Sequence, residues 1–215
     1  MDAELVDYYR RRAAEYEAIY AKPERQADLA RLRELIPARL AGARALEVAC
    51  GTGYWTALLA QSAASVVATD LAGETLAIAH SKPLPAGRVR FEIADAYALP
   101  QSLGRFDAAF AGFWWSHVAR SRVDAFLASL HARLDPGARV LLLDNRYVEG
   151  SSTPLAGFDA EGNTFQMRTL ADGSSVRVMK NFPAEDELRG ALSPFAASFE
   201  YVALPHYWLV AYALR

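Results

Sequence analysis

The sequence predicts an α/β fold in which a parallel sheet is covered by helices on both faces. Short apolar runs of strand length alternate along the chain with helical patterns, which is typical of parallel strands joined by crossover helices. The first run, residues 45–50, breaks into Gly51-Thr52-Gly53, and a helical pattern begins at Tyr54. The next two runs end in acids, Asp70 and Asp95, at the edge where open α/β sheets bind their ligands.

The glycine turn after the first run predicts a binding site for a nucleotide-like ligand. Glycine lets the backbone bend sharply and lie against a ligand where a Cβ would block the approach. The helix that follows offers unpaired N–H groups and the positive end of its dipole, which suit a carboxylate or a phosphate. The dinucleotide fingerprint Gly-x-Gly-x-x-Gly is incomplete here, because Thr56 stands where the third glycine belongs.

The second run, residues 65–70, is a short β-branched strand that ends in Asp70. Asp70 follows Gly51 by 19 residues, close to the offset of ~20 at which an acid binds ribose hydroxyls in this architecture. A cap for the next helix is the structural alternative. The glycine turn at the right distance favours ribose binding.

Three further runs continue the pattern. Residues 89–96 alternate apolar and polar side chains and end in Asp95-Ala96, where a turn at the strand end is the alternative role for the acid. Residues 106–113 are almost wholly apolar, as expected of a strand that is covered on both faces. Residues 134–144 form a turn that leads into a fifth buried strand.

These features together resemble the class I S-adenosylmethionine-dependent methyltransferases of the small-molecule kind. The order Glu47-x-x-x-Gly51-x-Gly53 is similar to the first motif of that family. Leu134-Asp135-Pro136-Gly137 is similar to its Leu-x-Pro-Gly-Gly turn, with Ala138 in place of the second glycine. The resemblance covers residues 45–144 and weakens before residue 40 and from 145 to 195. It implies a Rossmann-like, seven-stranded, mostly parallel sheet with one antiparallel strand and helices on both faces.

The resemblance also implies S-adenosyl-L-methionine as the cofactor and a set of residues that bind it. The glycine turn would lie under the aminoacyl and ribose parts, Asp70 against the ribose, and Asp95 with the backbone of Ala96 against the adenine. The expected cofactor-binding residues are Tyr16, Glu47, Ala49, Gly51, Gly53, Thr56, Asp70, Leu71, Asp95, Ala96 and Phe113.

The N-terminal region predicts a helix over residues 7–20, followed by a second helix over residues 26–40. Tyr9 and Tyr16 are seven residues apart and therefore share one face of the first helix. In related small-molecule methyltransferases a tyrosine-bearing N-terminal helix lies over the cofactor as a lid, where a hydroxyl can reach the methionine carboxylate or the substrate. An aromatic stripe that only packs on the domain is the alternative.

The residues after the fourth strand are candidates for the substrate site. Trp114 and Trp115 lie where open α/β sheets bind ligands, and aromatic ring faces attract a cation such as a sulfonium. His117 aligns with a histidine that is often found here in the family. It is a candidate general base, because its ordinary pKa lies near working pH, or else a residue that holds the start of a helix. Tyr9 and His117 are the expected catalytic residues.

Residues 145–182 depart most from the family pattern and predict an inserted β-hairpin arm over the substrate pocket. Residues 163–170 and 174–180 flank Asp172-Gly173, and Asp-Gly between strand-like runs indicates a hairpin. Arg146 and Arg168 are candidates for holding an anionic group of the substrate, with surface or salt-bridge roles as the alternative. A helix starting at residues 183–188 and two strands at 199–204 and 207–214 close the chain.

The composition predicts a single domain over residues 1–215. It comprises lid helices (1–40), a cofactor-binding core (41–144), the arm (145–182) and a closing helix and strands (183–215). The net charge of −2 argues against a nucleic-acid partner. No histidine spacing suggests a metal site, and no apolar run has the length of a membrane span. The single cysteine, Cys50, fits a reducing cytoplasm, where we expect the protein to act as a monomer or homodimer.

The function predicted from the sequence is transfer of a methyl group to an N or O atom of a small-molecule acceptor by in-line displacement. Because the sulfonium is already an activated donor, positioning can supply much of the rate enhancement. Three alternatives remain at this point: a non-catalytic protein that binds S-adenosylmethionine or a partner, an RNA methyltransferase, and an NAD(P)-dependent oxidoreductase. Thr56 and Glu47 count against the last.

Overall fold

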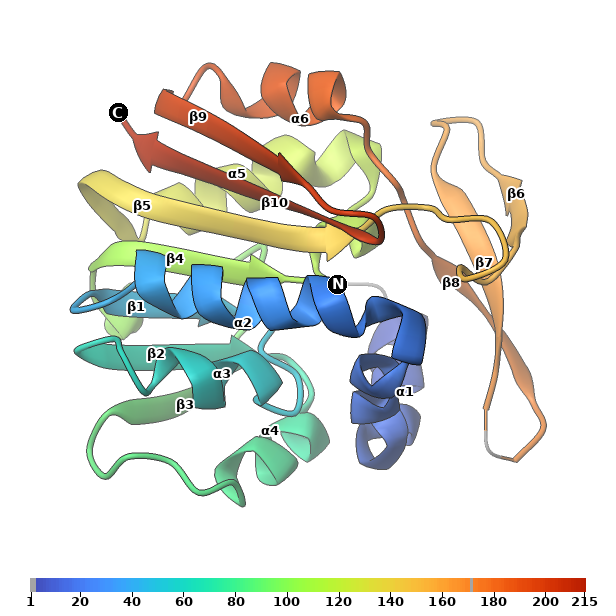
Figure 1. Cartoon of the computed structure of the whole chain (residues 1–215), viewed down its shortest axis with the longest axis horizontal. Coiled ribbons are helices and arrows are strands. Elements are labelled where there is room, and N and C mark those ends of the chain that lie inside the picture. The colour runs from blue at the N-terminus through green and yellow to red at the C-terminus, as the bar shows by residue number, and fades with distance from the viewer. Residues whose placement is uncertain (1–2, 171) are drawn as a thin grey trace.

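The computed structural model describes residues 3–170 and 172–215 and confirms the predicted fold class (Figure 1). Its main sheet has seven strands in the order β3-β2-β1-β4-β5-β10-β9. Strand β10 pairs antiparallel with both β5 and β9, and the other pairs are parallel. The strands are β1 Arg44–Val48, β2 Ser65–Asp70, β3 Val89–Ile93, β4 Phe106–Gly112, β5 Leu134–Asn145, β9 Ala196–Ala203 and β10 Tyr207–Leu214.

Helices cover both faces of this sheet, because its central strands are apolar on both sides. Leu141 and Leu143 of β5 join one core cluster with α2 and α3, and Val140 and Leu142 join the other with α5 and α6. The α-helices are α1 Ala3–Arg12, α2 Gln26–Arg39, α3 Tyr54–Leu59, α4 Gly73–His80, α5 Val123–His131 and α6 Glu185–Leu192. The short 3₁₀ helices are η1 Ala13–Ala21, η2 Pro23–Arg25, η3 Gln101–Leu103, η4 Trp115–His117 and η5 Arg120–Arg122.

The N-terminal region differs from the single helix predicted over residues 7–20. The α-helix ends at Arg12 and the chain continues as the 3₁₀ helix η1. In η1 the ring of Tyr20 is buried and stacks on Tyr54, with the ring centroids 3.8 Å apart. This tertiary contact, which no local pattern encodes, accompanies the tighter winding of the chain. Figure 1 shows α1 and η1 beside the carboxyl ends of the parallel strands.

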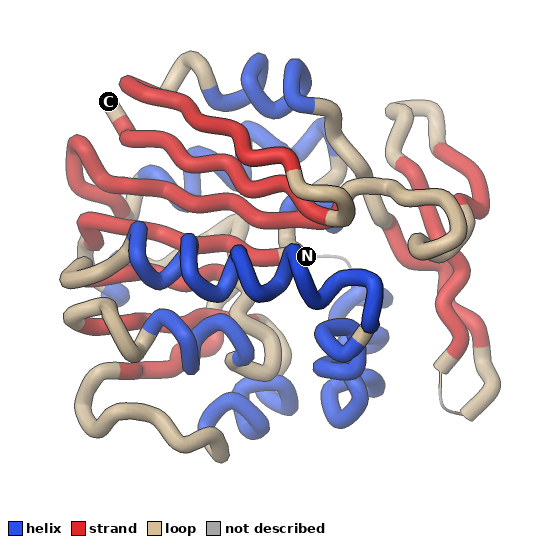
Figure 2. Tube along the Cα trace, in the orientation of Figure 1, coloured by secondary structure: helices blue, strands red, loops and turns tan. Residues whose placement is uncertain are grey.

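The predicted hairpin arm is present and has one strand more than expected. Strands β7 Thr164–Thr169 and β8 Ser175–Met179 form the hairpin, and β6 Leu155–Phe158 pairs with β7 to complete a three-stranded antiparallel sheet. Strand β6 was not predicted, because its four residues, Leu-Ala-Gly-Phe, do not alternate between apolar and polar side chains. Figure 2 shows the arm as a small sheet set apart from the main one.

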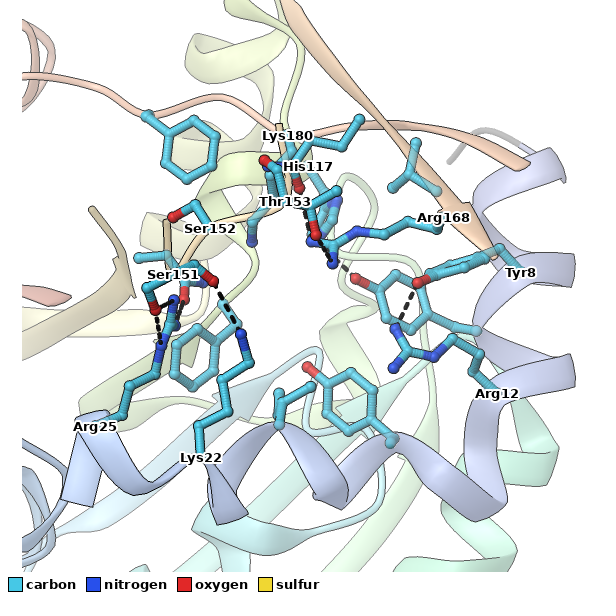
Figure 3. A pocket seen from close by; sticks show the side chains of 18 residues that line it. Tyr8, Arg12, Lys22, Arg25, His117, Ser151, Ser152, Thr153, Arg168 and Lys180 are labelled. Carbon is cyan, nitrogen blue, oxygen red and sulfur yellow. Dashed lines mark hydrogen bonds between the residues drawn. The ribbon is translucent and has the colours of Figure 1, made fainter. Parts of the chain in front are cut away.

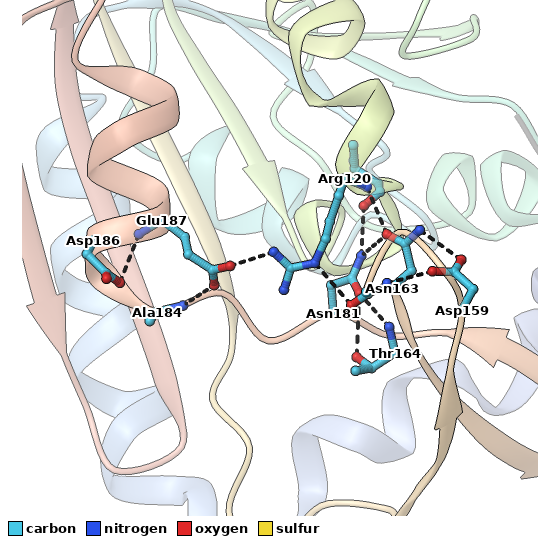
Figure 4. Close-up of polar contacts among 10 residues, drawn as sticks. Arg120, Asp159, Asn163, Thr164, Asn181, Ala184, Asp186 and Glu187 are labelled. Carbon is cyan, nitrogen blue, oxygen red and sulfur yellow. Dashed lines mark hydrogen bonds and ion pairs between the residues drawn. The ribbon is translucent and has the colours of Figure 1, made fainter.

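Buried amides fix the base of the arm to the core (Figure 4). The Asn181 side chain donates to the Val118 carbonyl at 3.0 Å and to Asn163 Oδ1 at 3.1 Å. Asn163 Oδ1 also accepts the Arg120 backbone N–H at 2.8 Å, and Asn181 Oδ1 accepts that of Thr164 at 2.8 Å. The arm therefore has a defined position over the sheet edge. No helix among residues 3–170 and 172–215 is long and apolar enough to cross a membrane.

Candidate active site

The glycine turn and Asp70 lie side by side because β1 and β2 pair in parallel. The Gly51 N–H donates to Asp70 Oδ2 at 2.8 Å, and the Ala72 N–H donates to Asp70 Oδ1 at 2.9 Å. The carboxylate therefore holds both the turn and the chain that leads into α4. It also lines a cavity, and burial raises the pKa of Asp70 above its ordinary value. Asp70 therefore supports the backbone and faces a cavity at the same time.

The two glycines of the turn have different surroundings. Gly51 lines the cavity with φ of +56°. Gly53 has φ of +75°, and a Cβ added there would lie 2.8 Å from the Cβ of Ala79 in α4. Gly53 therefore permits a left-handed backbone and close contact between the turn and α4, and its nearest neighbours belong to the protein.

We call the space at the carboxyl ends of β1, β2 and β4 the cofactor cavity. Of the expected cofactor-binding residues, it is lined by Tyr16, Ala49, Gly51, Asp70, Leu71 and Phe113. Ala72, Thr75 and Gly112 also line it and were not predicted. The other expected residues, Glu47, Gly53, Thr56, Asp95 and Ala96, do not line it. Asp95 follows β3, and its carboxylate accepts the Tyr97 N–H at 2.9 Å.

Two residues of this cavity hold unusual backbone conformations. Ala49, just after β1, has φ of +56°, and Phe113, just after β4, has φ of +61°. The left-handed region is unfavourable for residues with a Cβ and is concentrated at functional sites. Because β1 and β4 are neighbours in the sheet, both strained positions border the same space.

Buried polar groups near the cavity lack partners among the described residues. Glu47 is 2% exposed, its Oε2 has no hydrogen bond, and burial raises its pKa to about 8. The indole N–H of Trp114, which lines the cavity, also has no acceptor. Such groups are costly unless a water or a ligand satisfies them.

A second space, which we call the acceptor cavity, lies between the N-terminal segment and the arm (Figure 3). Its lining includes cationic side chains from both sides and no Asp or Glu among the described residues. These cations are Arg12, Lys22, Arg25, Arg168 and Lys180. Of them, only Lys180 forms an ion pair within the described part of the chain, with Asp144 at 3.2 Å. The cavity therefore carries a strong positive charge.

Arg168 is the one predicted substrate arginine that lines this cavity. Its guanidinium donates to Thr153 Oγ1 at 2.8 Å and to Gln166 Oε1 at 2.6 Å, and no carboxylate of the described residues pairs with it. Arg146 lies outside both cavities and donates to the Leu204 carbonyl at 2.8 Å. The two predicted tryptophans also separate. Trp114 lines the cofactor cavity, whereas Trp115 packs against Phe126 in the core.

The other cations of this cavity were not predicted from the sequence. Lys22 donates to the Ser151 carbonyl at 2.9 Å, and Arg25 donates to Asn145 Oδ1 at 2.9 Å. Both lie in the connection between η1 and α2, where no pattern marks a site. Lys180 could have been predicted to face the same side of the strand as Val176 and Val178, because the three residues are spaced by two.

Lys180 belongs to a buried polar network. Its ammonium donates to Ser116 Oγ at 2.6 Å and to Asp144 Oδ1 at 3.2 Å. Asp144 Oδ2 accepts the Ser116 N–H at 2.8 Å. Burial lowers the pKa of Lys180, and although burial opposes ionisation of Asp144, the neighbouring ammonium holds the pKa of Asp144 below its ordinary value. These bonds occupy two of the three ammonium hydrogens.

The predicted catalytic residues meet where the two cavities adjoin. Tyr9 Oη lies 2.6 Å from His117 Nε2, and His117 Nδ1 lies 2.8 Å from the Met179 carbonyl oxygen. Burial, reinforced by Lys180, lowers the pKa of His117 to about 3. Tyr9, Tyr16, Phe113 and His117 line both cavities. These four side chains therefore form a shared wall.

The fold and the site together define an α/β domain with a cavity at a glycine turn, as in proteins that bind nucleoside-type cofactors, and a second cavity that adjoins it. Residues 45–137 match the family model described as a methyltransferase domain. The chain belongs to the S-adenosylmethionine-dependent methyltransferases, with the class I fold.

Curated relatives support this membership. The chain is 31% identical over 176 residues to a demethylmenaquinone methyltransferase of Thermus thermophilus, a match that covers 75% of this chain and 77% of that protein. It is 32% identical over 155 residues to the enzyme of the same name from Clavibacter sepedonicus, covering 72% of this chain but only 60% of that protein.

Solved structures extend the likeness over nearly the whole chain. The DhpI-SAM-HEP complex superposes with a TM-score of 0.79 at 31% identity, covering 97% of this chain and 95% of that one. The DhpI-SAH complex has the same TM-score at 30% identity and covers 94% of its chain. Both complexes contain the cofactor or its demethylated product, in agreement with the cofactor predicted from the sequence.

Proposed function

We propose that this protein transfers the methyl group of S-adenosylmethionine to an oxygen or nitrogen atom of a small anionic acceptor. One observation carries the proposal: the cofactor cavity shares the wall of Tyr9, Tyr16, Phe113 and His117 with a cavity whose lining holds five cations and, among the described residues, no acid. A molecule in each cavity would face the other across this wall. In-line methyl transfer needs that arrangement of donor and acceptor.

The residues of the cofactor cavity fit S-adenosylmethionine. The Asp70 carboxylate suits ribose hydroxyls, and the rings of Phe113 and Trp114 suit a sulfonium or an apolar group. The indole N–H of Trp114, which has no acceptor among the described residues, fits a ligand that brings hydrogen-bonding atoms. When bound, the cofactor supplies an activated methyl group.

The charge of the acceptor cavity supports an anionic acceptor. Arg25, Arg168 and Lys180 retain N–H groups that can bind an oxyanion, and a guanidinium suits the planar carboxylate as well as the tetrahedral phosphate type. The related DhpI structure, in which SAM and HEP are bound together, supports the pairing of this cofactor with a second bound molecule. Enclosure between the N-terminal segment and the arm favours a small molecule over a nucleic acid.

The charge and the cysteine content of the chain support a location and argue against one class of partner in this proposal. The acidic net charge and the lone Cys50 favour a cytoplasmic protein that does not act on nucleic acid. We assign Asp70 to the ribose, and the four residues of the shared wall to alignment of the reacting groups. An acceptor that is already an anion has a free electron pair, so the chain does not need to remove a proton from it.

The first test is calorimetric titration with S-adenosylmethionine, S-adenosylhomocysteine, NAD and NADP. We expect binding of the first two alone. Labelled methyl donor should then be supplied with small phosphates, phosphonates and carboxylates, and with neutral alcohols as the contrast. Methylation of neutral acceptors only would contradict the anionic acceptor, and binding of a dinucleotide instead would contradict the methyltransferase.

Arg168→Gln tests the acceptor cavity, and Arg146→Gln is its matched control. Loss of the Arg168 charge should raise the KM for an anionic acceptor by roughly 10- to 100-fold, as expected for a charge-assisted hydrogen bond. Arg146→Gln should leave that KM unchanged, because Arg146 lies outside both cavities. Equal effects of the two variants would rule out a specific role for Arg168.

A further inference from the structure

We infer that His117 is a positioning residue that fixes the Tyr9 hydroxyl in the shared wall, and that methyl transfer at this site proceeds without a general base. The second part rests on the proposed function, whereas the first concerns the protein alone. The sequence allowed His117 to be either a base or a structural residue. The hydrogen-bond geometry separates these roles.

The two partners of His117 determine where its single proton lies. A backbone carbonyl can only accept, so His117 Nδ1, 2.8 Å from the Met179 oxygen, must be the donor. In a neutral imidazole Nε2 then carries a lone pair and no hydrogen. Tyr9 Oη, 2.6 Å from Nε2, must therefore donate. The lone pair that a general base would use is already occupied.

The charges around the ring favour the neutral form. Lys180, which follows β8, and Arg168 of β7 oppose a positive charge, and Asp144 of β5 favours one but is itself paired with Lys180. Tyr9 is the group that faces the ring from α1. Together with burial these neighbours lower the pKa of His117, so the ring stays neutral over the whole physiological range.

Tyr9 is no substitute for a base. Burial raises the pKa of its phenol well above the ordinary value, and Tyr16 and Tyr8 reinforce that shift. Its hydrogen points to His117, so the remaining lone pairs of the oxygen are available to the two cavities that Tyr9 lines. The pair therefore offers an oriented, uncharged oxygen in the shared wall.

The reaction balances without a proton transfer when the acceptor is an anion. The electron pair of the acceptor oxygen forms the new bond to the methyl carbon as the carbon–sulfur bond breaks. The bonding pair stays on sulfur, which becomes a neutral thioether, and the acceptor loses one negative charge. No side chain has to accept or return a proton.

Nitrogen-15 NMR of the histidine side chains tests the first part in the unliganded protein. We expect His117 to show a protonated Nδ1 and an unprotonated Nε2, with no titration from about pH 5 to 8. Tyr9→Phe should move the Nε2 resonance of His117 towards that of an unbonded ring nitrogen. An Nε2–H tautomer, or titration near pH 6.5, would overturn the assignment.

The chain contains a matched control pair far from the cavities. His131 Nε2 lies 2.7 Å from Tyr212 Oη. Tyr212→Phe should therefore shift the resonances of His131 and leave those of His117 unchanged, and Tyr9→Phe should do the reverse. The two variants also identify which signals belong to which ring.

Kinetics with an anionic acceptor test the second part. We expect kcat to be constant from about pH 6 to 8.5 and to show no solvent isotope effect. Tyr9→Phe should lower kcat by about tenfold, and kcat should remain independent of pH.

His117→Asn, which keeps an acceptor for Tyr9, should retain more activity than His117→Leu. A fall in kcat below pH 7 that is lost with His117 would establish a general base. Failure of the acceptor screen would contradict the proposed function and leave the tautomer result standing.

Discussion

Asp70 shows how one carboxylate serves both the fold and the site. Its two oxygens accept the N–H groups of Gly51 and Ala72, and its side chain lines the cofactor cavity. The sequence could predict this position, because the length of a strand and the spacing from a glycine turn determine which residue stands at the sheet edge. Asp95 was predicted by the same reasoning and lies outside the cavity lining.

Removal of the Asp70 carboxylate should weaken cofactor binding. We expect Asp70→Ala to lower the affinity for S-adenosylhomocysteine at least tenfold, from loss of charge-assisted bonds worth about 1.5–3 kcal/mol. Calorimetry on the folded variant measures the effect. Asp107→Ala is the control. Asp107 accepts the Arg44 N–H at 2.8 Å at the amino ends of the strands, away from the cofactor cavity. Unchanged affinity in Asp70→Ala would remove the ribose assignment.

Glu47 should make stability depend on pH. Its pKa is about 8 in the folded protein because of burial, above the ordinary carboxyl value, so the folded state holds a proton that the unfolded state has released. Stability is therefore lost as pH rises through this interval. Glu47→Gln has no group to titrate there, so its free energy of unfolding should not fall in this way. The difference in free energy of unfolding, variant minus parent, should therefore increase as pH rises from about 5 to 8. Urea titrations at several pH values measure this difference. A constant difference between the two proteins would contradict the buried, protonated acid.

At the scale of elements, the arm is held at its base by buried amides and nearer its tip by contacts with the N-terminal helix. The base carries the buried amides of Asn163 and Asn181. The tip meets the N-terminal helix through the exposed pair of Arg11 and Asp172, 2.5 Å apart, and exposed ion pairs contribute less than about 1 kcal/mol. Next to this pair, Tyr8 of α1 packs with Leu170 and Val178 of the arm in a small buried cluster, so apolar burial contributes more than the ion pair to the contact between α1 and the arm.

Asn181→Ala tests the base of the arm. The variant leaves the Val118 carbonyl and the Thr164 N–H without partners, so we expect the free energy of unfolding to fall by roughly 2–3 kcal/mol. Hydrogen exchange should accelerate in β7 and β8 and stay slow in β1 and β4. Glu185→Ala, which breaks an exposed pair with Arg189, is the control and should have little effect. Uniform acceleration throughout the sheet would contradict a local anchor.

For the whole molecule, cofactor binding should stabilise the fold. A ligand at 100 times its Kd adds about 2.7 kcal/mol to the free energy of unfolding. For a chain of 215 residues this should raise Tm by roughly 5–10 °C with S-adenosylhomocysteine. Thermal denaturation followed by circular dichroism measures the shift. NAD at the same concentration should leave Tm unchanged, and an equal rise with NAD would contradict selectivity of the cofactor cavity.

The sequence predicted the main sheet because apolar periodicity and turn residues act over short distances. The strand before Gly51, the helix after it, the hairpin around Gly173 and the antiparallel closing strand all followed from local patterns and from the family resemblance. The acceptor cavity did not. Arg25 and Lys180 are far apart in sequence, and they face one space only because buried amides fix the arm. No local sequence pattern predicts that these two side chains line the same cavity.

The left-handed backbones of Ala49 and Phe113, which line the cofactor cavity, lower the stability of the fold. Each such residue costs roughly 1–2 kcal/mol, a large share of the small net stability of an ordinary domain. Glycine would remove that cost at Ala49. At Phe113 it would also remove a buried ring that packs against Tyr20 and Tyr207 and forms part of the wall between the cavities. The ring of Phe113 therefore supports the fold and the wall together, whereas the left-handed backbone of Ala49 carries its cost with only a methyl group at the cofactor cavity.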